Sequence, residues 1–253
     1  MKFNREKYLN RINYSGRLDP DINTLRQLQK AHLLNVPFEN LDIHLKTAIE
    51  LDTDRIYEKI VINNRGGFCY ELNGLFFELL NSLGFDVKRI SARVHVEDDQ
   101  FSPEYDHLTL VVTINGAEYL TDVGFGEFIF GPLKLEFDVP QKDPRGTYMV
   151  KKYDADHMVI LRLENGDTKP EYMFKNMGRD LKEFGSRCQY HQSDQRSHFM
   201  KKRMISLPTE YGRITLSGNT LKIKQRDKTS EKNLVDEFEF KKALWDNFKI
   251  SLD

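Results

Sequence analysis

The residue with the clearest chemical potential in this sequence is a cysteine at the expected start of a helix. Cys69 comes shortly after the glycine pair at 66–67, and the apolar residues that follow it recur at the spacing of one helix face. These apolar residues are Leu72, Leu75, Phe76, Leu79, Leu80 and Leu83. The N–H groups and the positive dipole end of a helix N-terminus favour an anion, and a thiolate is such an anion. Cys69 is therefore a candidate nucleophile, although a cysteine in a Phe-rich segment is more often a small buried apolar residue.

A predicted hairpin supplies a base for this nucleophile. Asn115-Gly116 is a strong signal for a two-residue turn, and this turn places Thr109 opposite Asp122. His107 and Asp122 are then diagonal neighbours on one face, roughly 7–8 Å apart at the backbone, which allows an imidazole–carboxylate hydrogen bond. The hairpin alone is equally compatible with a structural His–Asp pair. Together with a cysteine at a helix start, it provides the minimum machinery for acyl transfer through a thioester.

The other residues that could form a catalytic, metal-binding or nucleotide-binding site are weaker candidates. His191 and His198 flank a polar loop without metal-ligand spacing, and the two cysteines form neither a disulfide framework nor a metal-binding pair. The glycine-containing stretch 124–127 lacks the residues of a Walker or dinucleotide loop. We therefore expect no metal in this protein.

Composition limits the class of protein and its partners. The 253 residues are 39% hydrophobic and 30% charged, as in an ordinary soluble globular chain, and the net charge is −1. A chain without a basic field is not expected to gather nucleic acid or an anionic membrane. No apolar run approaches the ~20 residues of a membrane span, and the charged segment Met1–Asn10 does not read as a secretory signal. We expect a cytoplasmic protein.

The pattern of apolar residues predicts helices first and strands afterwards. A short opening helix is expected around Tyr8, a second from Asp19-Pro20 to the residues before Pro37, and a third that Thr53 or Asp54 begins. After Gly84 the period changes to alternation, and strands are expected at 87–96, 108–114, 117–123, 133–137, 148–152, 158–163 and 171–175. A short helix near 181–188, a hairpin at 214–224 and a closing helix through 240–248 complete an α+β fold.

Several runs of the sequence together resemble the arylamine N-acetyltransferases. The runs around Cys69, His107 and Asp122 are similar to that family's cysteine, histidine and aspartate motifs, in the same order along the chain. The runs that carry the resemblance are Val36–Leu41 (VPFENL), Arg65–Asn73 (RGGFCYELN), Asp106–Leu108 (DHL), Thr121–Gly126 (TDVGFG), Ser206–Glu210 (SLPTE) and Phe248–Leu252 (FKISL). The likeness covers nearly the whole chain, and several motifs in order are more specific than any one of them.

The resemblance implies an architecture. It consists of an N-terminal helical bundle, a central β-barrel and a C-terminal α/β lid, with a thiol-protease-like Cys-His-Asp triad. We accordingly expect a helical bundle over residues 1–84 that carries the nucleophile, a barrel over 85–200 that carries the histidine and aspartate, and a lid over 201–253.

The resemblance also implies a reaction and its site residues. Cys69 is the implied nucleophile, His107 its proton partner and Asp122 the orienting group. Acetyl-CoA is the implied co-substrate, and its acetyl group passes through a cysteine thioester to the nitrogen of an arylamine, an arylhydrazine or an N-hydroxyarylamine. Phe38, Phe125 and Phe130 match positions that line the acceptor pocket, and Phe68 is a further candidate for its wall. His95 departs from the family pattern, because it stands in the acceptor site where many relatives have an apolar residue. Gly124 and Gly126 are the implied contacts for coenzyme A, and Arg65 with Glu39 is the implied support for the cysteine loop.

Two other functions are compatible with the same residues. A thiol amide hydrolase or a transglutaminase-like acyltransferase uses the same three side chains. A non-catalytic binding protein with an inactive triad is the third hypothesis. The presence of all three residues in the geometry that the hairpin predicts argues against this last reading.

Overall fold

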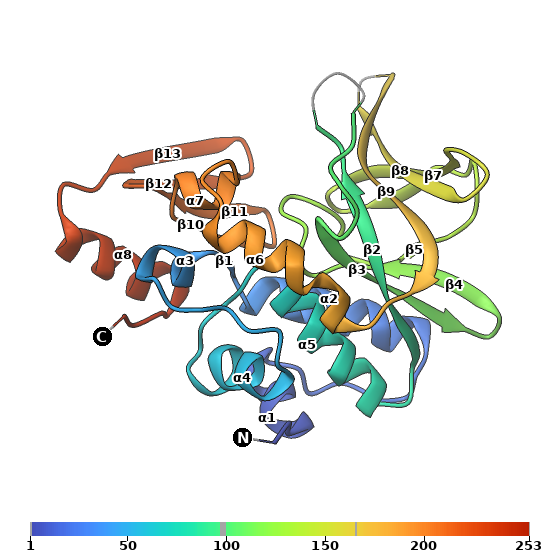
Figure 1. The fold of residues 1–253 in the computed structure, drawn as a ribbon, viewed down its shortest axis with the longest axis horizontal. Coiled ribbons are helices and arrows are strands. Elements are labelled where there is room, and N and C mark those ends of the chain that lie inside the picture. Colours follow the sequence, from blue (N-terminus) through green and yellow to red (C-terminus); the bar gives the residue numbers. More distant parts are fainter. Residues whose placement is uncertain (1, 97–99, 165, 253) are drawn as a thin grey trace. The chain divides into compact units, whose positions relative to one another are not determined.

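The computed structural model describes residues 2–96, 100–164 and 166–252 (Figure 1). The chain forms two compact units, each assembled from separate segments. The first unit comprises residues 1–14, 31–68 and 188–253, and the second comprises residues 15–30 and 69–187. The three-part division expected from the sequence stays a prediction.

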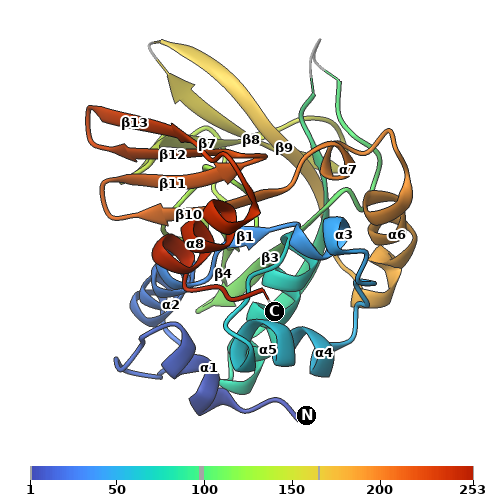
Figure 2. The same ribbon diagram turned by 90° about the vertical axis from the view of Figure 1, so that its left-hand side faces the viewer.

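The first unit combines short helices with an antiparallel sheet. Its strands lie in the order β1-β10-β11-β12-β13, and α8 covers one face of the sheet (Figure 2). The burial of Phe240, Leu244 and Phe248 on α8 against Ile205 and Leu216 holds helix and sheet together. The elements of this unit are α1 (Arg5–Arg11), β1 (Phe38–Glu39), α3 (Leu41–Leu45), α4 (Thr53–Tyr57), the π-helix η1 (Glu58–Ile62), α7 (His198–Lys201), β10 (Met204–Thr209), β11 (Gly212–Ser217), β12 (Thr220–Gln225), β13 (Lys228–Asn233) and α8 (Glu237–Phe248).

The second unit is built on an eight-stranded antiparallel sheet that curls into a nearly closed barrel. The strand order is β5-β4-β3-β2-β9-β8-β7-β6, and helix α5 packs against β2 and β3. The elements are α5 (Cys69–Ser82), β2 (Asp86–Val94), β3 (His107–Ile114), β4 (Ala117–Thr121), β5 (Leu133–Lys134), β6 (Gln141–Asp143), β7 (Gly146–Lys152), β8 (His157–Glu164), β9 (Asp167–Gly178) and the 3-10 helix η2 (Leu181–Phe184). Helices α2 (Ile22–Asn35) and α6 (Gly185–Ser193) contribute residues to both units.

The barrel closes through a side chain rather than through a ninth strand. The amide of Gln141 on β6 donates to the backbone oxygen of Lys134 on β5 over 2.8 Å and accepts from its backbone N–H over 2.9 Å. A primary amide carries one acceptor and two donors, so it can stand in for a peptide group between the two outer strands.

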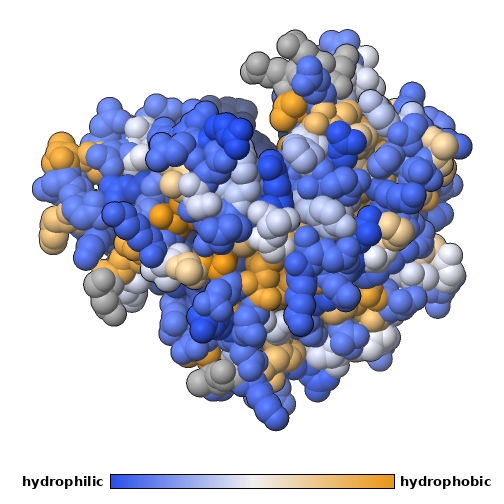
Figure 3. Space-filling model, in the orientation of Figure 1, coloured by the Kyte–Doolittle hydropathy of each residue, from blue (hydrophilic) through white to orange (hydrophobic). Residues whose placement is uncertain are grey.

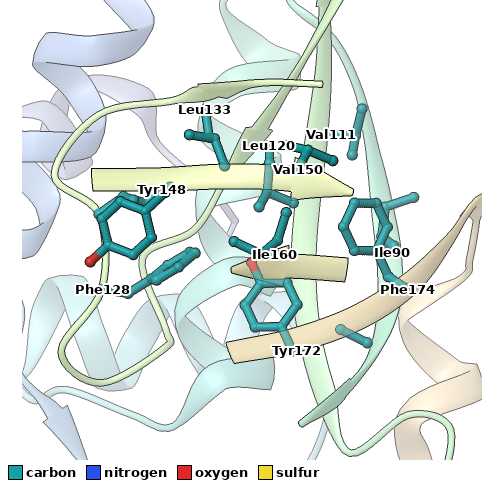
Figure 4. Close-up of a cluster of buried hydrophobic side chains, with 12 residues drawn as sticks. Ile90, Val111, Leu120, Phe128, Leu133, Tyr148, Val150, Ile160, Tyr172 and Phe174 are labelled. Carbon is teal, nitrogen blue, oxygen red and sulfur yellow. The ribbon is translucent and has the colours of Figure 1, made fainter. Parts of the chain in front are cut away.

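The barrel interior is a continuous apolar core (Figure 4). Alternate residues of the strands point inward, as the period of two requires, so that Val111, Leu120, Tyr148, Ile160 and Tyr172 share one cluster. The Tyr148 ring lies edge-on to Phe128, and its hydroxyl has no hydrogen-bond partner among the described residues.

The elements follow the expected α+β order, with two corrections at helix starts. Helix α2 begins at Ile22 rather than at Pro20, because the side chain of Asp21 accepts from the Thr24 backbone N–H over 2.8 Å. Asp19, expected as the cap, instead pairs with Arg17. Helix α4 begins at Thr53 with Asp52, not Thr53 or Asp54, as its cap. Strands β1, β6, β10 and β13 were not predicted.

Neither unit carries a membrane-spanning helix within the described ranges. None of the helices there is both long and apolar enough to cross a bilayer. Most of the face shown in Figure 3 is hydrophilic.

Candidate active site

The candidate nucleophile lies at the first position of a buried helix. Cys69 is the first residue of α5, as the sequence predicts, and its exposed fraction is 4%. The chain reaches this point through a tight approach in the first unit, where a Cβ at Gly66 would collide with the Pro37 carbonyl group. A glycine is therefore required at position 66.

The predicted hairpin forms in the predicted register. Asn115 and Gly116 both have positive φ, 51° and 79°, as a two-residue turn of this kind requires. Ile114 pairs with Ala117 and Leu110 with Thr121, and Asp122 follows directly on the last paired residue. His107 Nε2 and Asp122 Oδ2 lie 2.7 Å apart, in a buried hydrogen bond.

The Asp122 carboxylate is held by four donors. His107 and the Tyr172 hydroxyl, which is 3.1 Å away, bond to Oδ2, while the Asn73 amide and the Gly124 backbone N–H bond to Oδ1 over 2.9 and 2.8 Å. Burial alone would raise the pKa of Asp122, but the charge and hydrogen bond of His107, with the bonds from Asn73 and Gly124, lower it. The carboxylate is thus fixed as an anion in one orientation.

Asn73 is a site residue that the sequence reasoning missed. Its amide donates to Asp122 and to the Leu108 backbone oxygen over 2.7 Å, and its carbonyl oxygen accepts from the Val123 N–H over 2.9 Å. It connects the helix of the nucleophile to β3 and to the segment that follows β4. The signal that could have found it is its spacing, because Asn73 stands four residues after Cys69 and therefore on the same face of α5.

Cys69 and His107 interact directly. With Nε2 bonded to Asp122, the other ring nitrogen, Nδ1, is left for the Cys69 sulfur, which hydrogen-bonds the imidazole. Burial alone would lower the pKa of His107, but the Asp122 carboxylate and, to a smaller extent, Cys69 raise it to about 10. The imidazole therefore holds its proton at neutral pH beside the Cys69 sulfur.

This proton makes a testable contribution to stability. The folded protein holds it up to a pH of about 10, whereas the unfolded chain releases it near 6.5. The contribution is thus complete below pH 6.5 and is lost as the pH rises to about 10, with a limiting slope of about 1.4 kcal/mol per pH unit. We expect urea unfolding between pH 6.5 and 10 to show this loss in Cys69→Ser and not in Cys69→Ser/His107→Gln. The serine background removes the titration of the thiol, and equal slopes in the two variants would contradict the prediction.

Gly124 and Phe125 enclose the pair from the loop after Asp122. A Cβ at Gly124 would lie 2.8 Å from the Cys69 Cα, so only glycine lets this loop approach the helix so closely. The Phe125 ring centroid lies 5.0 Å from that of His107 and 4.9 Å from that of Tyr172. An apolar wall thus stands against the imidazole.

Three other predicted residues of the second unit have different surroundings. The His95 ring packs edge-on against Phe101 beyond the end of β2. The Phe130 ring lies under the guanidinium group of Arg145, 4.1 Å from its centre. Gly126 has a φ of +33°, and a Cβ there would meet nothing within 4 Å. Their assignments to the acceptor and to coenzyme A stay predictions.

The four predicted residues of the first unit form two clusters. Phe38 and Phe68 both pack against Phe199, with ring centroids 5.9 and 6.0 Å apart. Arg65 bonds to Glu39 over 2.8 Å, as expected for a supporting pair.

The supporting pair belongs to a larger buried ion network. Asp42 and Lys59 join it, with Arg65 and Lys59 lying 2.8 and 2.7 Å from the Asp42 carboxylate. The sequence reasoning did not include these two residues. Burial opposes the charge of Asp42, but Lys59 and Arg65 lower the pKa of its carboxyl group.

No cluster of three or more His, Cys, Asp or Glu side chains that could hold a metal occurs within residues 2–96, 100–164 and 166–252.

The chain is similar to known proteins along nearly its whole length. Residues 21–253 match the family model described as N-acetyltransferase. The arylamine N-acetyltransferase of Mycolicibacterium smegmatis is 32% identical, over 97% of this chain and 91% of its own length. The structure of the Mycobacterium marinum arylamine N-acetyltransferase in complex with CoA has a TM-score of 0.88 and 31% identity, and the match covers 98% of this chain and 93% of that one. A Bacillus cereus arylamine N-acetyltransferase, described as having a Cys-His-Glu catalytic triad, has a TM-score of 0.90 at 25% identity over 100% of both chains.

Proposed function

Since the chain belongs to the arylamine N-acetyltransferase family, we propose that it transfers the acetyl group of acetyl-CoA to arylamines, arylhydrazines and N-hydroxyarylamines. The observation that carries this proposal is the hydrogen-bonded series from Cys69 through His107 to Asp122 within one unit. The proposed roles are nucleophile, proton carrier and orienting carboxylate.

The first half of the reaction forms an acetyl-cysteine. The Cys69 sulfur attacks the thioester carbonyl carbon, a new C–S bond forms, and the bond to the coenzyme sulfur breaks. His107 carries the proton that the leaving coenzyme thiolate takes up, since its imidazole already lies beside the reacting sulfur. This step leaves Cys69 acetylated and His107 neutral.

The second half transfers the acetyl group to the acceptor. The amine nitrogen attacks the acetyl carbon, the C–S bond to Cys69 breaks, and neutral His107 takes the proton that the nitrogen loses. Asp122 supports both halves because it keeps Nε2 as the protonated nitrogen and leaves Nδ1 to exchange the proton. The enzyme returns to its starting thiolate–imidazolium pair.

Transfer to an amine requires that water does not consume the acetyl-cysteine first. Cys69 and His107 are both almost fully buried, and Phe125 covers the imidazole with an apolar ring. A flat aromatic acceptor suits such a wall, because aromatic rings pack well against one another. These features support an amine acceptor over hydrolysis.

Mass spectrometry of the enzyme mixed with acetyl-CoA alone tests the proposal. We expect one acetyl group on the peptide that contains Cys69 and none on the peptide that contains Cys188. An arylhydrazine should then discharge it as the acetylated product, and initial-rate plots should be parallel, as for a ping-pong reaction. Failure to accumulate acetyl-enzyme, together with intersecting plots, would favour direct transfer in a ternary complex. Loss of the acetyl group to water faster than to any amine would make the protein a thiol hydrolase.

A further inference from the structure

Two side chains of α5 bond to the backbone on either side of His107. The Tyr70 hydroxyl donates to the backbone oxygens of Tyr105 and Asp106, over 2.7 and 3.2 Å. The Asn73 amide donates to the backbone oxygen of Leu108 over 2.7 Å. The helix that begins with Cys69 is therefore tied to the chain immediately before and immediately after the base.

The backbone before His107 is strained and needs such support. Tyr105 has a φ of +66°, in the left-handed region that residues other than glycine, asparagine and aspartate seldom adopt. The Ser91 hydroxyl accepts from the Tyr105 N–H over 2.7 Å, and the Tyr105 ring packs edge-on against Phe184. A strained backbone conformation persists only where the surrounding contacts hold it in place. The hydrogen bond from the Tyr70 hydroxyl to the Tyr105 carbonyl group is one of these contacts.

A second interaction, from Arg187 on α6, holds the same segment before His107. The Arg187 guanidinium donates to the Asp106 carboxylate over 2.6 Å, and both side chains are largely buried. Tyr70 is itself fully buried and contacts Phe184 through its ring. Replacing Tyr70 with phenylalanine therefore keeps the buried ring and removes the bonds to the two carbonyl groups.

We propose that the Tyr70 hydroxyl is a positioning group that sets the separation and orientation of the Cys69 sulfur and the His107 imidazole. The inference rests on the proposed function, because it concerns the same nucleophile and base. Tyr70 is covalently next to Cys69, and its hydroxyl bonds to the two residues that lead into His107, so it links the backbone at the nucleophile to the backbone at the base.

The groups that surround His107 show which side of its ring depends on the Tyr70 hydroxyl. They are the Cys69 sulfur from α5, the Asp122 carboxylate after β4, the Tyr172 hydroxyl and ring from β9, and the Phe125 ring. Asp122 and Tyr172 hold the Nε2 side of the imidazole independently of Tyr70. Loss of the Tyr70 hydroxyl should therefore act on the Cys69 side of the ring.

Alkylation of Cys69 by iodoacetamide between pH 5 and 9 tests the proposal. The extent of reaction is read on the Cys69 peptide, so that Cys188 does not contribute. We expect Tyr70→Phe to lower the rate at pH 6 about tenfold, the order expected for loss of one buried hydrogen bond, and to shift the profile toward higher pH. The matched control is Tyr148→Phe, which removes a buried tyrosine hydroxyl without a partner among the described residues and should leave the profile unchanged.

The outcomes separate positioning from simple stability. A Tyr70→Phe protein with a lower melting temperature but an unchanged alkylation profile would overturn the proposal and make the hydroxyl purely structural. Should Tyr70→Phe not fold, Arg187→Gln decides, because it releases the same segment from the other side. A shifted profile in Arg187→Gln supports the proposal, and an unchanged one contradicts it. Alkylation requires no acetyl-CoA, so these results stand apart from the test of the acetyltransferase reaction.

Discussion

Replacing Asp122 with asparagine should lower kcat by a factor on the order of 10⁴, the loss that the same change causes in a serine triad. Asparagine has one oxygen and one NH₂ group where the carboxylate has two oxygens. The Oδ1 position faces two donors, Asn73 and the Gly124 N–H, so it must keep the oxygen. The NH₂ group then faces His107 Nε2, which can accept only when it carries no proton. This places the imidazole proton on Nδ1, where it prevents His107 from acting as a base toward Cys69.

A steady-state assay with acetyl-CoA and an arylhydrazine measures this loss, with circular dichroism and urea unfolding to show that the variant is folded. Tyr172→Phe is the matched control, because it removes one of the two bonds at Oδ2 and leaves the His107 bond in place. We expect the control to lose about tenfold at most. A folded Asp122→Asn protein with near-normal activity would remove Asp122 from the mechanism.

Replacing Arg65 with methionine should lower the free energy of unfolding by about 3–5 kcal/mol. Arg65 and Lys59 together balance the charges of Glu39 and Asp42, and Glu39 is completely buried. Without Arg65, one carboxylate charge in this cluster has no balancing cation, and removal of one partner from a buried ion pair is strongly destabilising. Urea denaturation followed by circular dichroism measures the change.

The double variant Glu39→Gln/Arg65→Met distinguishes charge from packing. Glutamine removes the unbalanced charge and keeps most of the shape, so the double variant should regain a large part of the lost stability. If the double variant is less stable than Arg65→Met alone, the network acts mainly through its hydrogen bonds, such as that from the Leu41 N–H to Glu39 over 2.7 Å.

The His107–Asp122 pair could be predicted because it depends on local rules. A two-residue turn at Asn115-Gly116 determines the register of both strands, and counting outward from the turn brings the histidine to the carboxylate. The start of α5 at Cys69 was equally local, since the glycine pair and the apolar period that mark it both lie within residues 66–83. The α+β fold class followed from the spacing of the apolar residues, which changes from helical to alternating after Gly84.

The other partners of Asp122 could not be predicted in this way. Tyr172 is fifty residues from Asp122 in the sequence, and it reaches the carboxylate only because β9 lies beside β2 in the barrel. The same holds for the bond between Tyr70 and the segment before His107, which depends on how α5 packs against the sheet. Strands β6 and β13 lack the apolar alternation that marks a strand, because their residues are mostly polar and lie at sheet edges.

The amide of Gln141 between β5 and β6 has a consequence for how this protein behaves at high concentration. An outer strand with free peptide groups is a template on which another chain can add a strand and begin to aggregate. Gln141 bonds to both backbone polar groups of Lys134 and so makes them unavailable to another strand. The sheet of the first unit protects its outer strand differently, with the exposed charges of Lys228, Glu231 and Lys232 along β13. The two outer strands are thus covered in different ways, by side-chain hydrogen bonds at β5 and by exposed charges at β13.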